Sequence, residues 1–173
     1  MGSMFRIAFL LALAVGSLLC AGCDRHESRK ARMEFHQLSR AEEDRLNKQR
    51  ELVLSAARVR YGTKGFTRSK TDLPVIQRLI DDRVFAKTQT FELQALGVVF
   101  GDVLASELGL HWELVTDEYG TDPVLRLGTH QVQISALTMI SKRAEDGKEV
   151  DVAALLDGVR DTLKQMKKSG DCK

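Results

Sequence analysis

The sequence predicts an α+β fold, in which a long N-terminal helix and further helices pack on a three-stranded antiparallel meander. Apolar residues recur at helical spacing in several segments between residues 33 and 168. Residues 110–134 instead contain short runs of strand-forming residues separated by turns. The 173 residues are 43% hydrophobic and 29% charged, with only two prolines. This composition is typical of one globular domain and excludes collagen, low-complexity disorder and polytopic membrane proteins.

The first 22 residues have the pattern of a secretory signal. Arg6 precedes an uncharged, largely apolar run at residues 7–19. Its length fits the roughly 7 to 15 residues of a signal peptide's apolar core and falls short of the roughly 20 that span a bilayer. We therefore expect residues 1–22 to be a signal peptide and residues 23–32 to form a polar tether.

Residues 19–23, Leu-Cys-Ala-Gly-Cys, resemble the end of a bacterial lipoprotein signal. The resemblance implies cleavage before Cys23 and acylation of its thiol, which would anchor the protein in the cell envelope, facing the periplasm. Cys20 departs from the family pattern, which usually has Leu there, and cleavage to a free periplasmic chain is the alternative. Asp24 resembles the signal that retains enterobacterial lipoproteins in the inner membrane.

The charges are unevenly distributed. Residues 24–70 carry 13 Lys+Arg and 7 Asp+Glu, whereas residues 71–173 carry 12 and 17. The basic part could lie on anionic lipid headgroups, each cation adding about 1 kcal/mol, or it could be the solvated face of a helix. The formal net charge of +2 is too balanced for a dedicated nucleic-acid binder, so no nucleic-acid partner is expected.

A basic helix and loop are expected at residues 33–70. Good helix formers run from about Met33 to Arg60 without Gly or Pro, and Gly62 ends the run. Apolar positions become dense after Leu52, which predicts that only the second half packs on a core.

An α+β domain is expected at residues 71–168, followed by a tail at 169–173. Asp72 or Thr71 is predicted to cap a helix that has Pro74 in its first turn. The next helix is predicted over 90–108, ending at Gly109. Its small residues at every fourth position indicate close packing rather than a ligand groove: Gly97, Gly101 and Ala105.

Three strands are predicted after this helix, at residues 110–116, 123–127 and 131–134. Short links between them favour an antiparallel meander. Ser135 is predicted to cap a helix to about Arg143, and Asp151 a last helix with an apolar face.

The stretch from Leu93 to Gly101, then Trp112, Asp117-x-x-Gly120 and residues 139–143 resemble the bacterial domain-of-unknown-function family 3806. The similarity covers roughly residues 71–165. It implies an α+β domain whose function is unassigned, and it brings no activity with it.

Six polar or amphipathic residues are candidates for a binding site, because turns between strands could present the acids while a helix end presents the bases: Trp112, Asp117, Tyr119, Asp122, Lys142 and Arg143. The alternative is that Trp112 is a core residue, that Asp117 serves turn geometry, and that the two bases complement a helix dipole.

No catalytic, metal or cofactor motif is present, and no small-molecule ligand is inferred. The histidines are scattered, and the sequence has no H-E-x-x-H, paired Cys motif, G-x-S-x-G or phosphate-binding glycine loop. His111 is expected to form a cross-strand surface pair with Glu113.

Three functions are compatible with these observations. The first is a lipid-anchored binding or scaffolding module with a protein partner. The second is an immunity-type protein, whose acidic residues 71–173 would complement a basic toxin. The third is an unrecognised hydrolase that uses Asp117 or Asp122.

Overall fold

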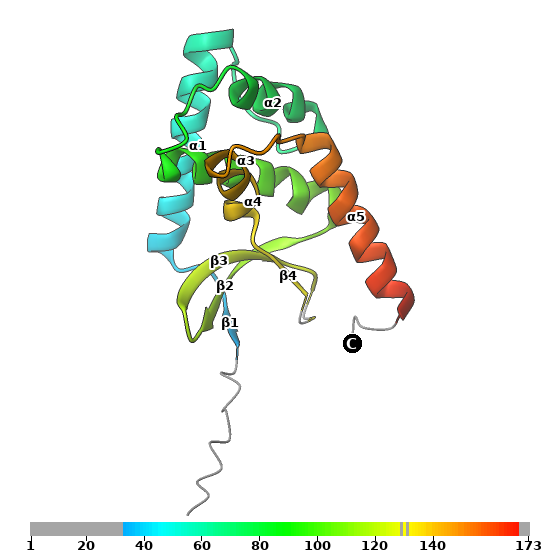
Figure 1. Cartoon of the computed structure of the whole chain (residues 1–173). Helices are drawn as coiled ribbons and strands as arrows, with labels where there is room; N and C mark the ends of the chain where they lie inside the picture. Colours follow the sequence, from blue (N-terminus) through cyan, green and yellow to red (C-terminus); the bar gives the residue numbers. More distant parts are fainter. Residues whose placement is uncertain (1–32, 129, 131, 170–173) are drawn as a thin grey trace, which may run out of the picture. The chain divides into compact units, whose positions relative to one another are not determined.

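The computed structural model describes residues 33–128, 130 and 132–169, which form five α-helices and one four-stranded antiparallel sheet (Figure 1). The α+β class is therefore confirmed. Within this part of the chain, no helix is both long enough and apolar enough to cross a membrane.

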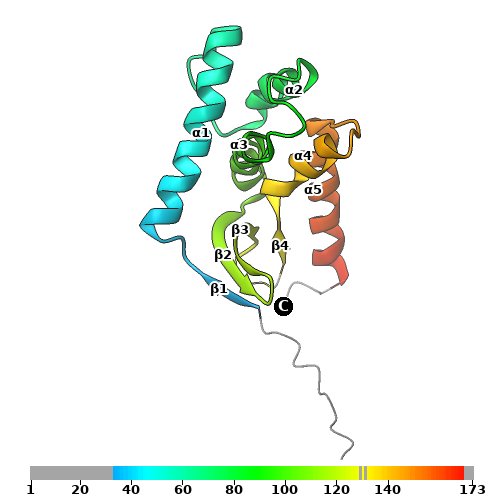
Figure 2. The ribbon, with the colours of Figure 1, turned by 60° about the vertical axis from the view of Figure 1, so that its left-hand side comes forward.

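Helix α3 (Thr90–Leu108) is the centre of the fold (Figure 2). Helices α1 (Arg40–Tyr61), α2 (Leu73–Asp81), α4 (Ala136–Glu145) and α5 (Val152–Ser169) all contact it. Its predicted limits are confirmed, and it ends at Gly109 with a φ of +68°. Such a helix is apolar on nearly every side because it is surrounded by other elements.

The glycines of α3 allow its neighbours to approach closely. A Cβ atom at Gly97 would lie 2.5 Å from the backbone oxygen of Leu137 in α4. A Cβ atom at Gly101 would lie 2.5 Å from the ring of Trp112. The prediction that these small residues mark close packing is confirmed for Gly97 and Gly101.

The sheet has the strand order β1-β2-β3-β4. Strands β2 (His111–Asp117), β3 (Gly120–Arg126) and β4 (Gln133–Ile134) form the predicted meander. The expectation of three strands is wrong, because β1 (Glu34–His36) pairs with β2 as a fourth. The guanidinium carbon of Arg126 lies 3.8 Å from the centre of the Phe35 ring, a cation–π contact that holds β1 on the sheet.

Helix α1 begins at Arg40 rather than Met33, which corrects the predicted start. Ser39 and Glu42 form a capping box: each side chain accepts a hydrogen bond from the other residue's backbone N–H. The buried face also begins earlier than expected, at Leu46 and Gln49, and packs on α3. The basic helix is thus part of the same compact unit as the rest of the described chain.

Local signals at the other helix starts are partly confirmed. Pro74 lies in the first turn of α2, and the Asp151 carboxylate accepts hydrogen bonds from the first turn of α5. Asp72 does not cap α2 through its side chain, because its carboxylate accepts the N–H groups of Thr67 and Ser69. Ser135 precedes α4 but makes no side-chain cap.

We expect Gly97→Ala to lower the free energy of unfolding by about 1–3 kcal/mol, because the new methyl group would have to displace the α4 backbone. Gly158→Ala on α5 is the matched control, since open space surrounds that position. It should raise stability by about 0.5–1 kcal/mol. Urea unfolding of both variants tests this, and equal effects would contradict the close approach of α3 and α4.

Candidate functional site

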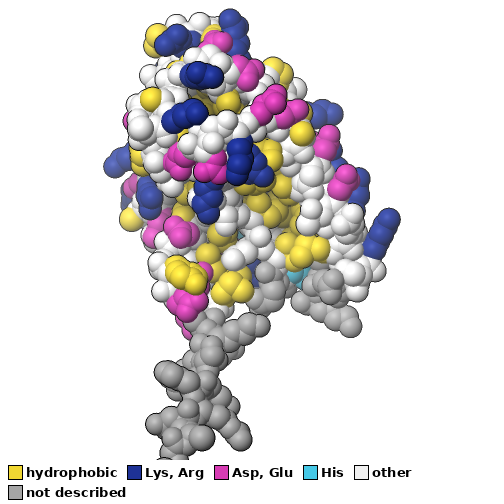
Figure 3. Space-filling model, viewed as in Figure 1, with side chains coloured by type: hydrophobic (Ala, Val, Ile, Leu, Met, Phe, Trp, Pro, Cys, Tyr) yellow, Lys and Arg dark blue, Asp and Glu magenta, His cyan; other side chains and the backbone are white. Residues whose placement is uncertain are grey.

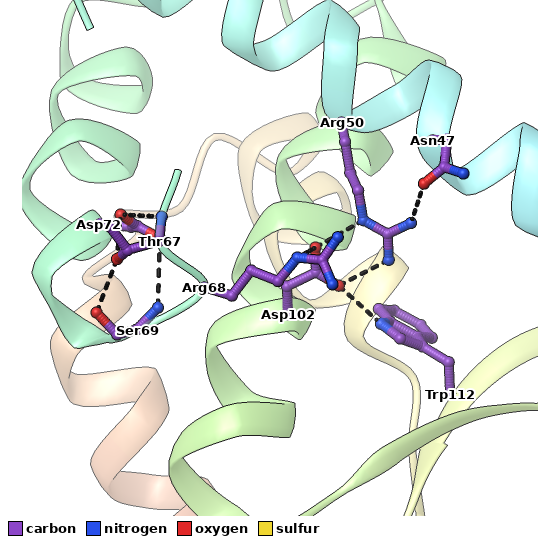
Figure 4. Close-up of polar contacts among 8 residues, drawn as sticks. All are labelled: Asn47, Arg50, Thr67, Arg68, Ser69, Asp72, Asp102 and Trp112. Carbon is purple, nitrogen blue, oxygen red and sulfur yellow. Dashed lines mark hydrogen bonds and ion pairs between the residues drawn. The ribbon is translucent and has the colours of Figure 1, made fainter. Parts of the chain in front are cut away.

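A carboxylate on the central helix accepts three hydrogen bonds from side chains of α1 and β2 (Figure 4). Asp102 is only 7% exposed. Arg50 of α1 donates to both of its oxygens, at 2.6 and 2.7 Å, and the Trp112 indole donates at 2.9 Å. Arg68 lies 3.9 Å away, in a second ion pair.

The Asp102 cluster, formed by Asp102 with Arg50, Arg68 and Trp112, connects elements of the fold rather than forming a reactive group. Three charge-assisted hydrogen bonds already occupy its oxygens. Arg68 adopts a positive φ of 58° in the loop before α2. Asp72 fixes this loop by accepting the Thr67 N–H at 3.0 and 2.9 Å. The cluster therefore joins α1, α3, β2 and the loop.

A second polar cluster lies on the sheet. The Glu113 carboxylate accepts from Arg126 at 2.7 Å and contacts His111 Nε2 at 2.8 Å. His111 and Glu113 are on one strand, so the expected cross-strand pair is instead Glu113 with Arg126. Burial pushes the pKa of Glu113 up, but the hydrogen bonds from Arg126 and His111 outweigh burial and place this pKa below its ordinary value of 4.5.

The predicted site residues of the sheet separate into two places. Asp117, Tyr119 and Asp122 come together around the β2–β3 turn, where the Asp117 carboxylate accepts the Tyr119 N–H at 2.8 Å. Tyr119 is 86% exposed. Trp112 is half-buried on β2, five residues before Asp117. At the rise of a β-strand, five residues correspond to about 17 Å.

The two predicted bases lie near the end of α4. Lys142 is exposed, and Arg143 donates to the backbone oxygen of Met139 at 2.7 Å. Among the described residues, no hydrogen bond or ion pair joins either base to Asp117 or Asp122. The structure therefore does not combine the six residues into one site. Cys23 and Asp24 lie outside the described residues.

An apolar groove was not anticipated from the sequence. It lies between β4, α4 and α5, has a volume of about 570 Å³, and is reached by Met33. Figure 3 shows hydrophobic side chains in the hollow between α4 and α5. We call it the α4–α5 groove; its lining residues are Met33, Val132, Gln133, Ile134, Met139, Arg143, Ala154, Leu155, Gly158, Val159, Thr162, Leu163 and Met166.

One sequence signal for this groove was available. Ala154, Gly158 and Thr162 recur every fourth residue on α5 and leave a shallow strip along the groove. No three His, Cys, Asp or Glu side chains are grouped to hold a metal ion in the described part of the chain.

Comparison with known proteins finds a family match over part of the chain and supports the fold. Residues 72–155 match the family described as "Domain of unknown function (DUF3806)", as the sequence resemblance implied. A crystal structure of a protein from Bacteroides thetaiotaomicron VPI-5482 superposes with a TM-score of 0.69 and 23% identity. The match covers 80% of this chain and 51% of the other, so this chain spans about half of that protein's length. No curated protein matches the sequence.

We expect Glu113→Gln to lower the free energy of unfolding by about 1–3 kcal/mol at pH 7, because the buried Arg126 loses its charged acceptor. The folded-state pKa of Glu113 is depressed, so its charge stabilises the fold above pH 4.5 and ceases to do so as the pH falls through the folded-state pKa. The difference from the wild type should therefore narrow in acid.

Urea unfolding between pH 7 and pH 3, about four pH units, measures this difference. Glu118→Gln, at an exposed turn residue, is the matched control and should change stability little. A cost for Glu113→Gln that does not vary with pH would contradict the assignment.

Proposed function

We propose that this chain, whose residues 72–155 match the DUF3806 family, is a lipid-anchored protein of the bacterial cell envelope that binds a protein partner without catalysing a reaction. The single observation that carries the binding role is the α4–α5 groove. Its volume of about 570 Å³ lies within the range of roughly 300–1,000 Å³ that is usual for ligand sites.

The lining of the groove favours an amphipathic helix as its occupant. Met33, Met139 and Met166 supply flexible, polarisable side chains, which adapt well to the apolar face of a helix. Arg143 is the charged residue of the lining, and it pairs with no carboxylate among the described residues. We therefore assign the groove to a segment that carries one acidic residue beside its apolar face.

The anchor would hold this groove near a membrane. Met33 lines the groove, and nine residues separate it from Cys23, so the ten steps from Cys23 to Met33 reach about 35 Å when fully extended. Residues 24–32 contain four Lys or Arg, which would favour an anionic membrane surface. The partner is therefore proposed to be a membrane-proximal envelope protein, and Asp24 favours the inner membrane.

An immunity-type protein is the second proposal. Residues 71–173 contain 17 acidic and 12 basic residues, and this negative net charge would speed association with a basic toxin. Strains lacking the gene would then be more sensitive to toxin-producing siblings.

Lipid anchoring has a direct test. Protein recovered from bacterial membranes should have the mass of a chain that begins at Cys23 and carries acyl groups, and Cys23→Ser should abolish this species. Intact-mass spectrometry measures both. A cleaved chain without acyl groups would instead identify a free periplasmic protein.

The groove has an independent test. A photo-crosslinking residue in place of Thr162, which lines the groove, should form an adduct with an envelope protein in cells expressing the full chain. Peptide mapping should place the adduct on an amphipathic segment that contains an acidic residue. Adducts only with lipid, or only with a second copy of the chain, would overturn the proposed occupant.

Gly158→Leu should abolish the adduct by filling the groove, because open space surrounds this position. It should not lower stability, since a helical glycine is replaced by a good helix former worth about 0.5–1 kcal/mol. Ala41→Leu adds a similar side chain to the exposed face of α1 and is the matched control. A Gly158→Leu adduct as strong as that of Ala41→Leu would contradict the groove as the binding surface.

A further inference from the structure

A second hollow lies between the α2–α3 loop and the α4–α5 loop, and it shares no residue with the α4–α5 groove. Its floor is made of core side chains, each less than 5% exposed: Leu79, Leu93, Leu96 and Val150. Phe85 and Ala144 form part of the wall. The hollow therefore opens directly onto the hydrophobic core.

The volume of this hollow limits the size of its ligand. It measures about 160 Å³. An apolar cavity of about 150 Å³ in another protein accommodates benzene. A phenyl ring or a branched aliphatic group of about six carbons thus fits the hollow, whereas a long acyl chain does not.

The charged residues that line the hollow are all basic: Arg83, Lys87 and Lys148. Lys148 pairs with Asp146 at 2.8 Å, so its charge is largely compensated. Arg83 and Lys87 form no ion pair with a described carboxylate. The mouth therefore retains two uncompensated cations above an apolar floor.

The backbone places these two cations beside the hollow. Arg83 has a φ of +49°, a conformation that costs a non-glycine residue about 1–2 kcal/mol. The Lys87 ammonium lies 2.7 Å from the point that a Cβ of Gly147 would occupy, so it rests close to the Gly147 backbone. Gly147 also has a positive φ, of 71°.

The acids near the hollow have other partners. Glu92 accepts from the Gln89 amide at 3.2 Å, and Glu145 accepts from the Thr90 hydroxyl at 2.7 Å. The N-terminal turn of α3 includes Leu93 of the floor, and its helix dipole adds positive potential at the hollow. The neutral donors leave the charges of Glu92 and Glu145 in place, so the preference for an anion rests on Arg83, Lys87 and this helix dipole.

We infer that this hollow, the Lys87 pocket, binds a carboxylate that carries an apolar group of about six carbons, with the apolar group on the core floor and the carboxylate between Arg83 and Lys87. A free carboxylic acid and the C-terminal residue of a peptide share this chemistry. The inference does not depend on the α4–α5 groove or on lipid anchoring.

Isothermal titration of the full chain from residue 23, carrying Cys23→Ser, tests this inference. The probes are phenylacetate, 4-methylpentanoate, and acetyl-Gly-Gly-Phe with a free or an amidated C-terminus. The free-acid peptide should bind at least about tenfold more tightly than the amide. Binding of the peptide alone assigns the pocket to peptide C-termini, and binding of the small acids alone assigns it to free carboxylates.

Lys87→Gln should weaken binding of the acids about tenfold, whereas Lys164→Gln on exposed α5 should leave binding unchanged. Arg83→Gly also removes a cation but relieves the positive φ, so it should weaken binding without lowering stability. Gly158→Leu should have no effect, which separates this pocket from the groove.

Three results would overturn the inference. They are equal binding of amide and acid, an equal effect of Lys164→Gln and Lys87→Gln, and no binding of any probe at about 10 mM, well above the millimolar range of weak ligands.

Discussion

The burial of Asp102 is the constraint on which the assembly of this fold depends. A carboxylate on the central helix is tolerated only when it is paired and fully hydrogen-bonded. Arg50 of α1 and Trp112 of β2 both donate to this carboxylate, so the Asp102 side chain fixes the position of both elements on α3. The glycine just before it, Gly101, leaves the space in which the Trp112 ring lies.

This constraint also explains why the first strand forms. Since Asp102 fixes α1 and the start of β2, the chain just before α1 is brought beside the sheet. Only three residues, 37–39, separate β1 from α1, and Ser39 ends this link by capping the helix. β1 is then held by its ladder with β2 and by Phe35 against Arg126.

Elements set by local chemistry were predictable from the sequence, and those set by distant partners were not. The limits of α3 follow from its apolar pattern and Gly109, and the start of α5 follows from Asp151. A strand of three residues has too little alternation to be recognised, so the sequence predicts helix where β1 forms. Arg50 and Asp102 are 52 residues apart, and nothing in the sequence pairs them.

The arrangement of the candidate site also depends on tertiary packing, which the sequence alone does not reveal. The sequence predicts six polar or amphipathic residues as candidates, but three of them lie around the β2–β3 turn. A fourth, Trp112, donates a hydrogen bond to Asp102 instead. The hollows are instead formed where helices and loops meet, a property of tertiary packing. Their walls differ in a way that bears on selectivity.

Methionines and half-buried side chains line the α4–α5 groove, and such walls adjust to an extended apolar surface. The floor of the Lys87 pocket belongs to the close-packed core and cannot adjust without disturbing α3. The same fold thus offers one adaptable surface for a helix and one rigid pocket for a small apolar group. Selectivity for ligand shape should therefore be greater in the Lys87 pocket, where a misfit strains the core, than in the groove.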